Sequence, residues 1–123
     1  MRIGIDIDNT ITYTTEMIMH YASIFGNERG LNTVPDNNYY YLEDALGWEK
    51  ETADHFLTQN LQYIYKDMQP KERAPEVIRE LKKDHEIILI TSRNRKFHDV
   101  EQITADWLHR NSIVYDKLIL NAT

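Results

Sequence analysis

The chain has 123 residues, of which 41% are hydrophobic and 28% are charged, a balance typical of one folded domain rather than of a disordered segment. Its 20 acidic residues outnumber its 14 basic residues, and the net charge of -6 argues against a nucleic-acid polymer as partner. The sequence contains no cysteine, which excludes disulfides, thiolate zinc sites and thiol catalysis.

The N-terminal residues predict a buried strand. Residues 2–7 (RIGIDI) form a β-branched run that ends in acidic and polar residues, as expected of a parallel strand that presents polar groups at its carboxyl end. Acidic residues interrupt this run before it reaches the length of a signal peptide, and no later stretch is apolar for long enough to span a bilayer. We therefore expect a cytoplasmic protein with no membrane partner.

A helical insertion is predicted after this strand. Apolar side chains recur at helical spacing from residue 14 or 15 to residue 25, and Gly26 predicts the end of that helix. Residues 26–38 are rich in Gly, Asn, Pro and Asp and predict a loop. A second helix is expected to begin at Thr52 or Asp54.

The insertion also contains a group of aromatic side chains. Such rings stack on a nucleobase in some binding sites, but packing inside a small helical lobe is the favoured interpretation here. The residues concerned are Tyr39, Tyr40, Tyr41 and Trp48.

The remaining segments alternate between helix and strand, which predicts an α/β fold with a Rossmann-like parallel sheet of three strands. We assign residues 1–13 and 74–123 to this core and residues 14–73 to a small helical cap inserted into it. The predicted elements of the second part are a helix over residues 75–83, a strand over 86–91, a helix over 97–110 and a strand over 113–120.

Acidic side chains at the end of the first strand are the main functional signal. Ligands of open parallel sheets bind beyond the carboxyl ends of the strands, and Asp6 and Asp8 are expected at such an end. Two carboxylates two residues apart can divide the work of phosphate ester cleavage, with Asp6 attacking phosphorus and Asp8 donating a proton to the leaving oxygen. The alternative is that Asp8, Asn9 and Thr10 form a polar turn that caps the next helix.

The end of the second predicted strand carries Thr91 and Ser92. Because the carboxyl ends of parallel strands meet at one edge of a sheet, these hydroxyls are expected near Asp6 and Asp8. Thr and Ser also commonly begin helices, and this capping role is compatible with phosphate binding because helix amino ends attract anions.

These residues resemble a known family. The string Ile5-Asp6-Ile7-Asp8-Asn9-Thr10 matches the DxDx[TV] first motif of the haloacid-dehalogenase-like phosphohydrolases, and Ile90-Thr91-Ser92-Arg93 is similar to their second motif. With a helical insertion between the motifs, the chain resembles the branch with a cap at this position, which includes deoxyribonucleotidase-like proteins. The resemblance covers most of the chain.

The resemblance implies a Mg²⁺-dependent phosphomonoester hydrolase that acts on a small phosphorylated metabolite or a nucleotide. Asp6 would be the nucleophile that forms an aspartyl-phosphate, and Asp8 the general acid and then base. The Asp6 carboxylate and the Asp8 main-chain carbonyl would hold the Mg²⁺, an ion that prefers oxygen ligands. Asn9, Thr10, Thr91 and Ser92 would bind the substrate phosphate, together with backbone N–H groups of residues 7–10.

Two parts of the family pattern have no clear counterpart. A third-motif lysine and a fourth-motif acid pair cannot be placed, and Lys117, the one candidate lysine, falls near the start of the third predicted strand. Arg93 either adds a cation near the phosphate, orients Asp8, or is a solvated loop residue. The alternative function is therefore a non-catalytic remnant that binds phosphate or metal.

The family topology also places a fourth strand beside the first one. The predicted sheet is therefore incomplete, and its first strand has an open edge, which invites pairing with another strand. We expect either a missing C-terminal segment or a second copy of the chain to cover this edge.

Overall fold

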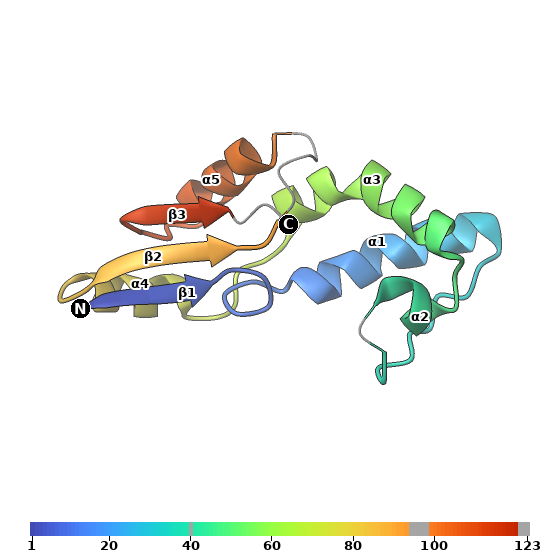
Figure 1. Ribbon diagram of the computed structural model, residues 1–123, viewed down its shortest axis with the longest axis horizontal. Coiled ribbons are helices and arrows are strands. Elements are labelled where there is room, and N and C mark those ends of the chain that lie inside the picture. The colour runs from blue at the N-terminus through green and yellow to red at the C-terminus, as the bar shows by residue number, and fades with distance from the viewer. Residues whose placement is uncertain (40, 94–98, 121–123) are drawn as a thin grey trace.

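The described residues, 1–39, 41–93 and 99–120 of a computed structural model, form one sheet of three parallel strands flanked by helices (Figure 1). The strands are β1 (Arg2–Asp6), β2 (Glu86–Thr91) and β3 (Lys117–Leu120), in the order β1-β2-β3. Asp6 pairs with Ile90, and Thr91 pairs with Leu120, so the carboxyl ends of the strands meet at one edge. The predicted α/β class with a parallel sheet is confirmed.

One face of the sheet is covered by the helices α4 (Ala74–Lys82) and α5 (Val100–Arg110). The β2 side chains Ile87 and Leu89 are fully buried on this face, in the same cluster as Trp107 of α5. The β2 side chains that alternate with them are only half-buried, so the opposite face of the sheet is less covered. No helix in the described part of the chain is long and apolar enough to cross a membrane.

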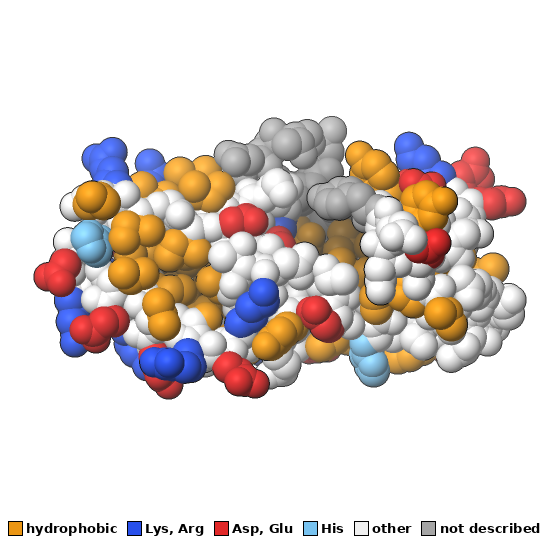
Figure 2. Space-filling model, turned by 90° about the horizontal axis from the view of Figure 1, so that it is seen from below, with side chains coloured by type: hydrophobic (Ala, Val, Ile, Leu, Met, Phe, Trp, Pro, Cys, Tyr) orange, Lys and Arg blue, Asp and Glu red, His pale blue; other side chains and the backbone are white. Residues whose placement is uncertain are grey.

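The outer edge of β1 has no partner strand among the described residues. Hydrophobic side chains gather at the end of the molecule that holds β1 and α4 (Figure 2), where Ile5, Val77 and Leu81 line a groove of about 310 Å³. An unpaired edge beside apolar side chains is a surface on which another strand can pair. The expected cover, whether a further segment or a second copy, stays a prediction.

The helices α1 (Thr14–Arg29), α2 (Leu42–Leu46) and α3 (Lys50–Asp67) extend away from the sheet as a lobe of their own (Figure 1). The lobe has a separate aromatic core in which the ring centroids of Phe25 and Phe56 lie 5.2 Å apart. Trp48 packs on both rings and donates a hydrogen bond from Nε1 to the Asn32 carbonyl at 2.8 Å. The packing role of Trp48 is confirmed, but the same prediction was wrong for Tyr39 and Tyr41, which are exposed, and Tyr40 lies outside the described residues. The cap boundaries at residues 14 and 73 stay a prediction.

Several predicted boundaries were wrong for local reasons. Helix α1 continues past Gly26 to Arg29, and Gly30 ends it with a φ of 68°. Gly26 is instead buried against the lobe, where an added Cβ would lie 2.7 Å from Thr33 Cγ2, so its small size serves packing. Helix α3 begins at Lys50, and the short helix α2 was not predicted.

The second half of the chain shows two further differences. Strand β3 begins at Lys117 rather than at residue 113, because Ile113 turns into the core under α5. Helix α5 begins at Val100, while residues 97 and 98 of the predicted helix lie outside the described residues.

Asp116 joins the start of β3 to β2 and α4. Its backbone N–H donates to the Ile87 carbonyl at 2.8 Å, and its carboxylate accepts the Ile87 N–H at 2.8 Å and a hydrogen bond from Lys82 at 3.0 Å. The Ile87 N–H, followed by Lys82, lowers the pKa of Asp116 below its ordinary value of 3.8.

We expect Asp116→Asn to lower the free energy of unfolding, because an amide holds the Lys82 ammonium less well than a carboxylate does. A carboxyl whose pKa is lowered by folding stabilises the protein above its unfolded pKa, and this contribution is lost as the pH falls through the folded pKa. Urea unfolding should therefore show the largest difference between wild type and variant at neutral pH, and a vanishing difference well below pH 3.8. Asp84→Asn, which changes a turn carboxylate, is the control, and a difference independent of pH would contradict this account.

Candidate functional site

The chain leaves β1 through a tight loop that closes on itself. The Ile7 carbonyl accepts the N–H groups of Thr10 at 3.2 Å and Ile11 at 3.0 Å, and Thr12 Oγ1 accepts the Asn9 N–H at 3.1 Å. Asn9 has a φ of 64°, a left-handed conformation that asparagine tolerates better than most residues. This loop directs the side chains that follow β1 across the edge of the sheet.

Most backbone N–H groups of residues 7–10, which were expected to bind the substrate phosphate, are already used in hydrogen bonds within the protein. The N–H groups of Ile7, Asn9 and Thr10 donate to acceptors within the protein, and only the Asp8 N–H has no such acceptor among the described residues. The Asn9 side chain accepts the Thr15 N–H at 2.9 Å in the first turn of α1. For Asn9 the helix-capping alternative therefore describes its position better than phosphate binding does.

The Asp8 carboxylate is held on both oxygens. Arg93 approaches it with two nitrogens, Nη2 at 2.8 Å from Oδ1 and Nε at 3.1 Å from Oδ2. The Thr14 hydroxyl donates to Oδ1 at 2.7 Å, and the Thr91 hydroxyl donates to Oδ2 at 3.2 Å. Burial alone would raise the pKa of Asp8, but these hydrogen bonds and the Arg93 charge outweigh it and hold the pKa below its ordinary value.

Arg93 is a buried cation whose side chain is 1% exposed. Its Nη1 donates to Thr104 Oγ1 of α5 at 2.9 Å, and its guanidinium lies 3.9 Å from the centre of the Tyr65 ring on α3. Nη2 also lies 3.4 Å from Met68 Sδ. This environment excludes the alternative that Arg93 is a solvated loop residue. It agrees with the alternative that Arg93 orients Asp8.

The other predicted site residues are more exposed. Asp6 ends β1, and its carboxylate forms no hydrogen bond or ion pair with the described residues, which leaves both oxygens open to a ligand. Thr10 and Ser92 are also exposed near the ends of β1 and β2. Lys117 does not join this group, because it pairs with Ile88 at the opposite end of β3 and thus lies away from the strand ends.

Lys71 is a cation near the loop that the sequence pattern did not single out. Its ammonium donates a hydrogen bond to the Asn9 carbonyl. Lys71 reaches this position because Pro70 forms an isolated antiparallel bridge with Thr12, and the Lys71 N–H donates to the Ile11 carbonyl at 2.8 Å. Only this pairing between distant segments brings Lys71 to the loop, so no periodicity or motif could have indicated it.

A cavity of about 770 Å³, the cap cleft, opens beside Asp8 and Asn9. Thr14 and Thr15 line the same end, at the start of α1. The cleft continues along the cap between α1 and α3 and reaches the segment around α2. Its size lies within the range of about 300–1,000 Å³ that small-ligand sites occupy.

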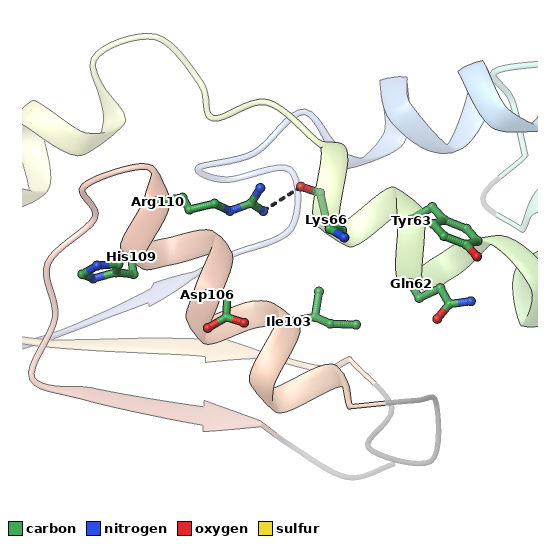
Figure 3. Close-up of a pocket in the computed structure, with 7 residues that line it drawn as sticks. All are labelled: Gln62, Tyr63, Lys66, Ile103, Asp106, His109 and Arg110. Carbon is green, nitrogen blue, oxygen red and sulfur yellow. Dashed lines mark hydrogen bonds between the residues drawn. The ribbon is translucent and has the colours of Figure 1, made fainter.

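A second cavity of about 470 Å³ lies between α3 and α5. Figure 3 shows Lys66 and Tyr63 of α3 on one side of it and Asp106 and Arg110 of α5 on the other. Arg110 Nη2 donates to the Lys66 carbonyl at 2.9 Å and so ties the two helices together. None of the predicted site residues lines this cavity, and it is not part of the candidate site.

The residues at the strand ends offer oxygen atoms to a cation. Among the described residues, no three or more His, Cys, Asp and Glu side chains form a group that could hold a metal ion. Magnesium, however, commonly binds to one or two carboxylates and completes its shell with water and substrate phosphate oxygens. The open Asp6 carboxylate and the main-chain carbonyl of Asp8 fit that kind of site.

The chain is similar to two bacterial proteins. It is 32% identical to "Putative nucleotidase YqfW" of Bacillus subtilis over 120 residues, which are 98% of this chain and 59% of the relative. It is 29% identical to "Putative nucleotidase BH1399" of Halalkalibacterium halodurans over 119 residues, which are 97% of this chain and 58% of the relative. No family model matches the chain. The chain thus spans less than two thirds of the length of these relatives.

Proposed function

We propose that this protein is a Mg²⁺-dependent phosphomonoester hydrolase that removes the phosphate of nucleotides through an aspartyl-phosphate on Asp6. The observation that carries the proposal is the combination of an open Asp6 carboxylate at the end of β1 with Asp8, whose carboxylate lies beside a cleft of about 770 Å³. The DxDx[TV] resemblance supports the reaction class, and the names of the two relatives support a nucleotide substrate.

In the first step an Asp6 oxygen attacks phosphorus, and the bond between phosphorus and the leaving-group oxygen breaks. Asp8 gives its proton to that oxygen, which departs as an alcohol. In the second step water attacks the phosphorus of the aspartyl-phosphate and gives a proton to Asp8. The bond between Asp6 and phosphorus breaks, and inorganic phosphate leaves.

Proton transfer by Asp8 requires a change in its charge and in its hydrogen bonds. The hydrogen bonds and the charge of Arg93 hold the pKa of Asp8 below its ordinary value, so the carboxylate is ionised and has to take up a proton before the first step. Both of its oxygens are occupied by Arg93, Thr14 and Thr91, so at least one of these bonds has to open before Asp8 reaches a leaving-group oxygen. The Thr91 hydroxyl that is then released can donate to a phosphoryl oxygen. The Asp8 N–H and the hydroxyls of exposed Thr10 and Ser92 are further donors at this edge.

The Asp6 carboxylate and the Asp8 carbonyl would hold the Mg²⁺, which would supply positive charge against the phosphoryl oxygens. We expect phosphate release from nucleoside monophosphates to require Mg²⁺, to stop when the ion is chelated and to return when Mg²⁺ is added in excess. The measurement is the release of inorganic phosphate from a panel of nucleoside, sugar and polyol monophosphates, with and without the chelator. Equal rates with and without the chelator would contradict the role of Mg²⁺.

A second candidate function is phosphate or metal binding without turnover. It is favoured by the occupied Asp8 carboxylate and by the lack, among the described residues, of a group of three or more acidic or histidine side chains that could hold a metal ion. Calorimetric titration with a nucleoside monophosphate distinguishes the two, because this candidate predicts heat of binding with no phosphate release over hours.

A further inference from the structure

We propose that Glu43, Lys50 and Asp54 select the leaving group: they favour an uncharged, donor-rich one of nucleoside length and reject one that bears a second phosphate. This inference rests on the proposed function and concerns the part of the cap cleft farthest from Asp8. All three side chains line the same cavity as Asp8 and Asn9. They are specificity residues and take no part in bond breaking.

The length of the cleft indicates the size of the leaving group. Tyr65 lies near the C-terminal end of α3 and stacks on Arg93, which binds Asp8, so this end of the helix lies beside Asp8. Asp54 lies eleven residues earlier on the same helix. Eleven residues correspond to about 16 Å of helix axis. A phosphate bound at the Asp6 loop therefore reaches the Asp54 region only through an extended group such as a nucleoside, and a short polyol would leave that region empty.

The walls of the cleft suit a flat apolar body. Ile18 of α1, Leu57 of α3 and Leu42 of α2 line it between its two polar ends, and each is half-buried. Apolar walls with a few polar groups at defined places are the usual composition of a small-ligand site. A nucleobase matches such walls with its faces and presents its hydrogen-bond donors at its edge.

The charged side chains at the end of the cleft farthest from Asp8 determine which groups the leaving group can have there. Glu43 and Asp54 contribute two negative charges and Lys50 one positive charge, and none of the three pairs with another described residue. Carboxylates accept strong hydrogen bonds from the N–H and O–H groups of a nucleoside. A second phosphate would meet net repulsion, and one unit charge a few ångströms away in a partly hydrated cleft changes binding by about tenfold.

The decisive experiment compares kcat/KM for the monophosphate of a long linear α,ω-diol with that for the corresponding bisphosphate. The second phosphate of such an extended molecule reaches the far end of the cleft, whereas the 3′-phosphate of a nucleotide would lie on the ribose, nearer to Asp8. We expect wild type to prefer the monophosphate, and Glu43→Gln combined with Asp54→Asn to raise the relative value for the bisphosphate by about tenfold or more. Lys50→Gln should shift the ratio in the opposite direction. Glu51→Gln is the matched control, because Glu51 is exposed on the same turn of α3 and does not line the cleft.

The same ratios are measured as binding constants on the Asp6→Asn protein by calorimetry, so the inference is tested apart from turnover. If wild type releases phosphate but neither the double variant nor Lys50→Gln changes the ratio, the inference fails and the proposed function stands. If binding shows the expected ratios but none of the proteins that retain Asp6 releases phosphate, the inference on selection holds and the proposed hydrolase function fails. If neither substrate binds, both proposals are overturned.

Discussion

Asp6→Asn is expected to reduce Mg²⁺-dependent phosphate release by about 10⁴-fold or more, because loss of a covalent nucleophile removes the pathway and not only a contact. The structure favours Asp6 for this role because its carboxylate is exposed at the end of β1 and engages no described residue. Asp8, by contrast, is held by four hydrogen bonds. The measurement is the single-turnover rate with a nucleoside monophosphate at saturating Mg²⁺.

Asp106→Asn is the matched control for this experiment, since it makes the same chemical change at an exposed residue of α5 away from the strand ends. It should retain the wild-type rate. Because the Asp6 carboxylate is exposed and forms no hydrogen bond with the described residues, Asp6→Asn should also keep the wild-type free energy of unfolding. A rate close to that of wild type in a folded Asp6→Asn protein would exclude the aspartyl-phosphate mechanism.

Arg93→Met should lower the free energy of unfolding by about 3–5 kcal/mol, the usual cost when one partner of a buried ion pair is removed. The side chains of Arg93 and Asp8 are 1% and 26% exposed, so water can replace the lost partner only in part. The variant would leave the Asp8 carboxylate in a desolvated position with only two threonine hydroxyls. Urea unfolding monitored by circular dichroism measures the change.

A double-mutant cycle separates the ion pair from packing. Asp8→Asn alone should also be strongly destabilising, but the double variant Asp8→Asn/Arg93→Met should lose less than the sum of the single changes, because neither charge is then left without a partner. Arg2→Met is the control: Arg2 pairs with Glu86 at 2.8 Å, but its side chain is 77% exposed. Such a surface pair contributes about 0–1 kcal/mol. Additive losses in the cycle would mean that the Asp8–Arg93 pair has no special role.

The strands and the strand-end motif could be predicted because their signals are local. The run from Arg2 to Asp6 and the run from Glu86 to Thr91 are short, β-branched and bounded by polar residues, and strands of this kind alternate with helices in parallel sheets. A parallel arrangement brings their carboxyl ends to one edge whatever the packing details are. Asp8 and Thr91 were therefore expected to be neighbours, and their side chains are hydrogen-bonded.

The surroundings of Asp8 could not be predicted in the same way. The sequence left three roles open for Arg93, in some of which it would be exposed and in others buried. Its burial depends on Tyr65 of α3 and Thr104 of α5. These contacts join segments far apart in the chain, and a single arginine, tyrosine or threonine leaves no periodic pattern. The position of Lys71 beside the loop has the same origin, in the bridge between Thr12 and Pro70.

Local patterns thus determined the α/β class, the parallel strands and the placement of Asp6 and Asp8 at their carboxyl edge, because hydrophobic periodicity and turn residues act over a few positions. Tertiary contacts determined that Asp8 is clamped while Asp6 is open, that Asn9 caps α1, and that the charged side chains of α2 and α3 face the same cleft. Those outcomes depend on how the cap helices pack against the sheet, which is a property of surfaces brought together from the whole chain.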